Sequence, residues 1–136
     1  MNLSSRPPDP EIFIDRSLGR RIADTLTVAG ATVHHHDDHF SQGVEDEVWL
    51  TEVGERGWVV LTKDKSIRYR AIERNALMNA GIKAFFFMSG NFPFEQMAQV
   101  IAASLPKIRQ FVEKHEAPFI AGIYKDGSVK LLFPKD

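Results

Sequence analysis

The chain has 136 residues, no cysteine, 43% hydrophobic residues and a formal net charge of −1. This length suits one domain over residues 1–136, and the lack of cysteine excludes disulfides and thiolate metal sites. A nearly neutral chain needs a local basic patch if it is to bind nucleic acid. The sequence has neither a signal peptide nor an apolar run of the ~18 residues that a membrane span requires. We therefore expect a soluble, cytoplasmic protein.

Apolar runs rich in β-forming residues predict four strands of a buried parallel sheet. Stretches between them predict helices, and a glycine ends each one, at Gly30, Gly57 and Gly81. Ser17 is expected to cap the first helix, and residues 36–43 to form a polar loop. The expected strands are 12–14, 31–35, 58–62 and 82–87, and the first three expected helices are 17–30, 44–57 and 66–80, the last with Ile67, Ala71 and Met78 facing inward.

The end of the chain has a different pattern. A fourth helix should begin at residues 91–93, and Pro106 should kink or split it. Residues 119–124 and 128–133 alternate around Asp126-Gly127, which predicts a β-hairpin with a type I′ turn. The whole order predicts an α/β fold, a three-layer parallel sheet with a C-terminal β-hairpin.

Two predicted strands run directly into an aspartate, Asp15 after 12–14 and Asp64 shortly after 58–62. In a flavodoxin-like strand order these strands are neighbours, so both side chains should lie at the same edge of the sheet. Asp46, at the front of the second helix, should overlook the same crevice. Taken singly, Asp15 and Asp64 are better explained as residues that form turns, and Asp46 as a charge at the N-terminus of a helix. As a set they predict a Mg²⁺ or Mn²⁺ site, because converging carboxylates need a cation.

The residues around these aspartates resemble a known family. Ile12-Phe13-Ile14-Asp15, Asp46-Glu47-Val48-Trp49 and Val60-Leu61-Thr62-Lys63-Asp64 are similar to segments of PIN-like domains, most closely the VapC-type toxins of toxin–antitoxin pairs. The resemblance covers about residues 11–90 and implies a metal-dependent ribonuclease whose acidic cluster is Asp15, Asp46 and Asp64. Arg16 stands where many relatives have a second acid, and Glu45 and Glu47 are the candidates for a fourth.

Five cations follow the third strand, and we interpret them as contacts for the phosphates of RNA. The alternative is a solvated helix face, which Arg70 and Arg74 at i,i+4 would show equally well. The five residues are Lys63, Lys65, Arg68, Arg70 and Arg74.

A histidine-rich tract, residues 34–39, resembles a transition-metal site. His34 and His36 would point opposite to His35 on a strand, however, so few of these rings can converge. The tract is better interpreted as a polar strand end, with one or two members lining the cleft.

The resemblance implies an endoribonuclease that acts as the toxin of a type II toxin–antitoxin pair. Two other functions stay open: a receiver-like module with Asp15 as metal ligand, Asp64 as phospho-acceptor and Ser89 as hydroxyl partner, and a PIN fold that only binds. The expected partners are RNA and a cognate antitoxin, with a second copy of the chain as a further candidate. Residues 91–136 lie beyond the resembling core and are expected to supply much of the antitoxin surface.

Overall fold

The computed structural model describes residues 9–64, 69–88 and 92–134. Up to β4, helices connect successive strands, with two of them, α2 and α3, between β2 and β3; two helices and a pair of strands follow. In chain order they are β1 (Ile12–Ile14), α1 (Arg20–Val28), β2 (Val33–His35), α2 (His36–His39), α3 (Asp46–Arg56), β3 (Val59–Thr62), α5 (Ala71–Asn79), β4 (Lys83–Phe87), α6 (Phe94–Ala103), α7 (Leu105–Lys114), β5 (Phe119–Ile123) and β6 (Val129–Phe133).

The strands form one six-stranded sheet in the order β2-β1-β3-β4-β5-β6. Strands β1 to β5 pair in parallel, and β6 runs antiparallel to β5 at the edge. This confirms the predicted parallel α/β fold and the flavodoxin-like neighbourhood of β1 and β3. Ile14 pairs with Leu61, so the carboxyl ends of the two strands stop at the same level.

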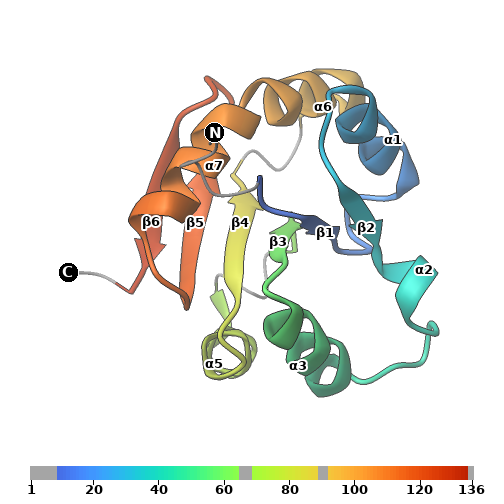
Figure 1. Ribbon diagram of the computed structural model, residues 1–136, viewed down its shortest axis with the longest axis vertical. Helices are drawn as coiled ribbons and strands as arrows, with labels where there is room; N and C mark the ends of the chain where they lie inside the picture. The colour runs from blue at the N-terminus through green and yellow to red at the C-terminus, as the bar shows by residue number, and fades with distance from the viewer. Residues whose placement is uncertain (1–8, 65–68, 89–91, 135–136) are drawn as a thin grey trace, which may run out of the picture.

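Helices cover both faces of the sheet, as a parallel sheet requires. Figure 1 shows α1 and α6 above the strands and α3 and α5 below them, and α7 packs on the same side as α1 and α6, since Ile108 and Phe111 join their core. Alternate residues of each central strand enter the two cores: Val59 and Leu61 pack on the first side, and Val60 packs with Phe13 and Trp49 on the second. All four residues of β3 are buried, which explains its unbroken apolar run.

Two predictions near β1 and β2 are wrong. Helix α1 begins at Arg20 and its N-cap is Gly19, not Ser17, because Ser17 is engaged with the ends of the strands. Residues 36–43 are not a continuous loop, since His36–His39 form the short helix α2. The side chain of His35 accepts a hydrogen bond from the Asp37 N–H and so caps this helix.

Helix α5 begins at Ala71, later than the predicted start, and its inward face also differs from the prediction. Ala71 is exposed, against the prediction, and the buried residue is Leu77; Met78 is partly buried and packs against the core, as predicted. The prediction that Ile67 faces inward lies outside the described residues. Pro106 does split the last helix as predicted, into α6 and α7, which meet at Ser104.

The hairpin is part of the sheet. Strand β5 extends the parallel ladder beside β4 and all five of its residues are buried, so it belongs to the core. The turn is not type I′, because that turn requires two positive φ angles and, among the described residues, only glycines have one. Gly127 has φ 86°, and the Gly127 N–H donates to the Tyr124 carbonyl at 2.8 Å, as in a three-residue hairpin loop.

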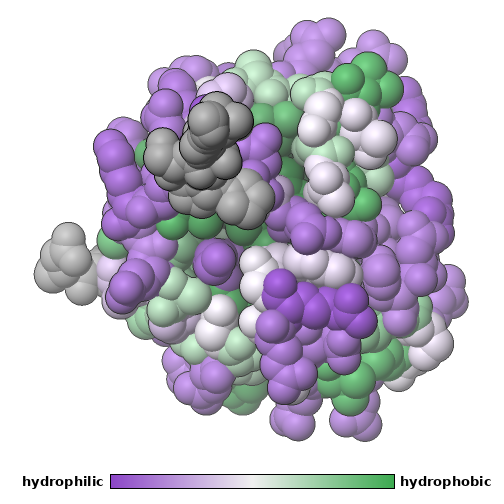
Figure 2. Space-filling model, viewed as in Figure 1, coloured by the Kyte–Doolittle hydropathy of each residue, from purple (hydrophilic) through white to green (hydrophobic). Residues whose placement is uncertain are grey.

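The surface is mixed. On the face shown in Figure 2, hydrophilic side chains surround separate apolar patches. A single exposed apolar side chain is normal in such a surface, and its position decides whether it has a role.

Replacing Phe119 with alanine should lower the free energy of unfolding by about 3–5 kcal/mol, because its ring is 1% exposed and packs against Phe85 and Phe111. Urea denaturation followed by circular dichroism measures this. Val28→Ala is the control, since Val28 is 89% exposed. A Phe119→Ala variant as stable as the control would show that the hairpin is not part of the core.

Candidate active site

Asp15 stands at the carboxyl end of β1 and is tied to the end of β3. The Asp15 N–H donates to the Leu61 carbonyl at 3.1 Å and so continues the pairing of the two strands. Its carboxylate oxygen Oδ2 accepts hydrogen bonds from the Thr62 hydroxyl at 2.9 Å and the Ser17 N–H at 3.2 Å. The local chain therefore fixes the direction of the Asp15 side chain.

The Thr62 hydroxyl is the centre of this network, and Thr62 is 0% exposed. It donates its proton to Asp15, so the Ser17 hydroxyl, 3.2 Å away, must donate to Thr62. The N–H of Asp64 also donates to Thr62 Oγ1, at 3.0 Å, and the N–H of Lys63 donates to Ser17 Oγ at 3.2 Å. One buried hydroxyl thus links Asp15 to the turn that carries Asp64.

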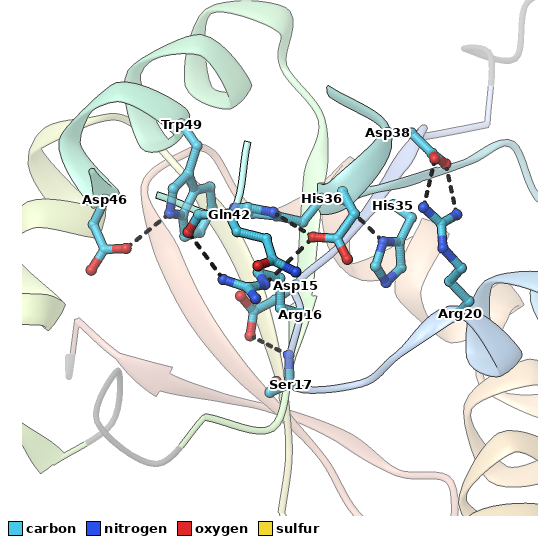
Figure 3. Close-up of polar contacts among 11 residues, drawn as sticks. Asp15, Arg16, Ser17, Arg20, His35, His36, Asp38, Gln42, Asp46 and Trp49 are labelled. Atoms are coloured by element: carbon cyan, nitrogen blue, oxygen red, sulfur yellow. Dashed lines mark hydrogen bonds and ion pairs between the residues drawn. The ribbon is translucent and has the colours of Figure 1, made fainter. Parts of the chain in front are cut away.

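Asp46 is the first residue of α3. The indole N–H of Trp49 donates to its Oδ1 at 3.0 Å, and the Trp49 ring stacks on Phe13 of β1 with centroids 5.5 Å apart. Figure 3 shows this bond and the Ser17–Asp15 bond, with the Arg20–Asp38 ion pair to one side. An anchored core ring therefore orients the Asp46 carboxylate.

The three aspartates line one pocket with a volume of about 210 Å³. Glu47, which the sequence suggested as a further acid, also lines it; Glu45, the other suggestion, is not among the lining residues. Glu73 of α5 is a lining acid that sequence reasoning missed, because the predicted helix 66–80 placed it beyond the first turn, whereas α5 begins at Ala71. The remaining lining residues are apolar: Trp49, Leu50, Ile72, Ala76 and Leu77.

The predicted RNA-binding cations that the structure describes lie outside this pocket lining. Lys63 and Arg70 are exposed, and Arg70 Nη1 lies 3.9 Å from Glu73 Oε1. Arg74 packs its guanidinium 4.8 Å from the centre of the Phe133 ring, on the core side of α5. Lys65 and Arg68 lie outside the described residues.

Arg16, next to Asp15 in the chain, faces the loop after α2. Its Nη1 donates to the Gln42 carbonyl at 3.3 Å, and its Nε lies 3.4 Å from Asp37 Oδ1. His36 Nδ1 lies 3.2 Å from the same oxygen of Asp37. Arg16 is thus held beside the aspartates by neutral and acidic partners of its own.

A divalent cation fits the donor chemistry of the pocket. In the described part of the chain, no three acidic or histidine side chains lie close enough to form a complete metal cage. Mg²⁺ does not need one, because it usually keeps several waters and binds through one or two carboxylates and a substrate phosphate. Both hydrogen bonds to the Asp15 carboxylate end on Oδ2, which leaves Oδ1 for a cation.

The histidine tract forms a separate structure, and it provides no metal cage among the described residues. His34 stacks on Trp58 at 3.8 Å, with its Nε2 2.8 Å from Glu11 Oε1 and its Nδ1 3.2 Å from His39 Nε2. Burial lowers the pKa of His35, so its neutral form stabilises the fold, and this contribution is lost as the pH falls below about 6.5. The tract is therefore structural, but none of its histidines lines the acidic pocket, so the expectation that one or two of them would do so is wrong.

Comparison with known proteins identifies the family. A family model described as "PIN like domain" matches residues 10–89, which is more than half of the chain and close to the predicted 11–90. The chain therefore belongs to the PIN-like domain family, as its resemblance predicted.

One curated relative defines the branch. The chain is 31% identical over 126 residues to "Putative ribonuclease VapC45" of Mycobacterium tuberculosis (strain ATCC 25618 / H37Rv), an alignment that covers 89% of this chain and 91% of that protein. This confirms the predicted VapC-type branch. No solved structure gives a significant match.

Thr62→Val should lower the free energy of unfolding by about 1–3 kcal/mol, because it leaves the Asp64 N–H and Asp15 Oδ2 without their buried partner. Thr62→Ser keeps the hydroxyl and should lose about 1 kcal/mol. Chemical denaturation compares the two, with Thr27→Val as an exposed control. Equal stability of the valine variant and the wild type would contradict the proposed linkage.

Proposed function

We propose that this protein is a Mg²⁺- or Mn²⁺-dependent endoribonuclease that acts as the toxin of a type II toxin–antitoxin pair. The observation that carries the proposal is the pocket lined by Asp15, Asp46 and Asp64 in a PIN-like fold. The name of the Mycobacterium tuberculosis relative, a ribonuclease, supports the same reaction.

In this proposal Asp15, Asp46 and Asp64 bind the cation at the end of the sheet, one or two of them directly and the rest through its waters. A bound divalent cation would activate water and stabilise charge on the phosphodiester group. The chain's own contribution is geometry: Thr62 and Ser17 orient Asp15, and Trp49 orients Asp46. Because these orienting groups are held in the strand ends and the core, the carboxylates need little rearrangement when RNA binds.

The RNA backbone must be held against a strongly acidic pocket, so cations beside it are required. Lys63, Lys65, Arg68 and Arg70 are the proposed phosphate contacts, since they follow β3 directly in the chain. The ion pair between Arg70 and Glu73 supports this role, because an exposed pair at 3.9 Å is weak and Arg70 can exchange Glu73 for a phosphate.

The proposed partners are an RNA substrate and a cognate antitoxin, with a second copy of the chain as a further candidate, in the cytoplasm. Within the described ranges, no helix is both long and apolar enough to cross a bilayer. Strand β6 supports an antitoxin surface in residues 91–136, because it is the sheet edge to which an extended peptide can add a strand.

A PIN fold that binds without cleaving is the second candidate. It is favoured by Arg16, whose positive charge lies beside Asp15 where an acid would strengthen cation binding. The receiver-like alternative loses support, because the matched family model describes a PIN-like domain; its hydroxyl residue, Ser89, lies outside the described residues.

Asp64→Asn should abolish RNA cleavage while the unfolding curve stays close to that of the wild type. The amide keeps the size of the side chain but removes the charge that binds the cation. Cleavage of total cellular RNA is followed on gels with Mg²⁺, with Mn²⁺ and with excess EDTA. Asp24→Asn, on the exposed face of α1, is the matched control and should retain activity. Full cleavage by Asp64→Asn, or in EDTA, would contradict the mechanism.

A further inference from the structure

Ile72 is an exposed apolar residue at the acidic pocket. It lies in the first turn of α5, it is 82% exposed, and it lines the pocket together with Asp15 and Asp64. Val28, the other large apolar side chain with comparable exposure among those described, is on α1 and lines no part of this pocket. The position of Ile72 thus separates it from ordinary exposed apolar residues.

Ile72 is the outer part of a continuous apolar wall. Behind it on α5 are Ala76, one turn further along the helix, and the buried Leu77, and Trp49 faces the same pocket from α3. The same lining carries the carboxylates of Asp15 and Asp64 at the ends of β1 and β3, and Glu73 stands next to Ile72 on α5. One pocket therefore combines cation-binding oxygens with an uncharged surface.

A nucleotide has the same two-part chemistry. Its phosphate and its base are joined through one ribose, so a phosphate held at the carboxylates brings a neighbouring base to the adjoining wall. Bases of single-stranded RNA can be splayed out of the strand, and proteins then cover their flat faces with side chains.

We infer that the apolar wall, at Ile72 and Ala76, binds the face of the nucleobase beside the scissile phosphate, and that Ile72 is a substrate-positioning residue. This inference rests on the proposed ribonuclease function. Packing of a base explains why an isoleucine side chain at the mouth of an acidic pocket is left exposed. A protein partner on the same wall is the competing occupant.

The test compares intact RNA with RNA that lacks one base. Cut sites of the wild type are first mapped on total cellular RNA, and a short oligonucleotide spanning one site is synthesised. Two further oligonucleotides carry an abasic ribose on either side of the cut. Values of kcat/KM are measured for the wild type, Ile72→Ala, Ile72→Leu and Val28→Ala.

On intact RNA, Ile72→Ala should lower kcat/KM by about 5- to 20-fold, because it removes most of the apolar contact with the base. On one of the two abasic oligonucleotides the same substitution should change kcat/KM less than twofold. Ile72→Leu keeps an apolar side chain and should retain most of the activity, and Val28→Ala should equal the wild type. Circular dichroism checks that each variant is folded.

Three results would overturn the inference. If Ile72→Ala cleaves intact RNA as well as the wild type does, Ile72 does not contact the RNA, and it binds either a protein partner or nothing. Equal loss on intact RNA and on both abasic oligonucleotides shows that Ile72 acts on something other than a base. A wild type that cleaves no RNA with either metal removes the proposed function itself, and this inference with it.

Discussion

The hydrogen bond from the Thr62 hydroxyl to the Asp15 carboxylate is the interaction on which the candidate site depends. The register of β1 and β3 brings the two residues together, and complete burial of Thr62 obliges its hydroxyl to find partners inside the protein. Because Thr62 also accepts the Asp64 N–H, one side chain sets the positions of two of the three aspartates. The contacts that join the ends of β1 and β3 therefore also position the aspartates of the site.

The sequence predicted the features that follow from burial. An unbroken apolar run requires cover on both faces, so β1 and β3 could be placed, and an aspartate at the end of each then had to lie at the same edge of the sheet. Features that depend on competition between hydrogen-bond partners could not be predicted. Ser17 is a good helix cap by type, but its hydroxyl is used by Thr62 and Lys63, and α1 starts after Gly19 instead.

Glu73 and the hairpin show a second limit of sequence reasoning. Glu73 reaches the pocket because α5 begins at Ala71, and the start of a helix depends on tertiary contacts as much as on propensity. The alternating pattern predicted a hairpin after the parallel strands, yet β5 joins the sheet as a fully buried parallel strand beside β4. In consequence β5 belongs to the core, and β6 is the strand of the described C-terminal region that lies at an edge of the sheet, where a partner could pair with it.

The negative charge of the pocket supports its proposed role as a cation-binding site. Carboxylates from two strand ends and two helices share about 210 Å³, and none of the pocket-lining residues in the described chain is basic. Such a pocket favours a cation. A crystal structure of the protein soaked in Mn²⁺ tests this most directly, through the anomalous signal of the metal. The account predicts an ion bound by Asp15 and at least one of Asp46 and Asp64; an ion bound only elsewhere, or an empty pocket at saturating Mn²⁺, would contradict it.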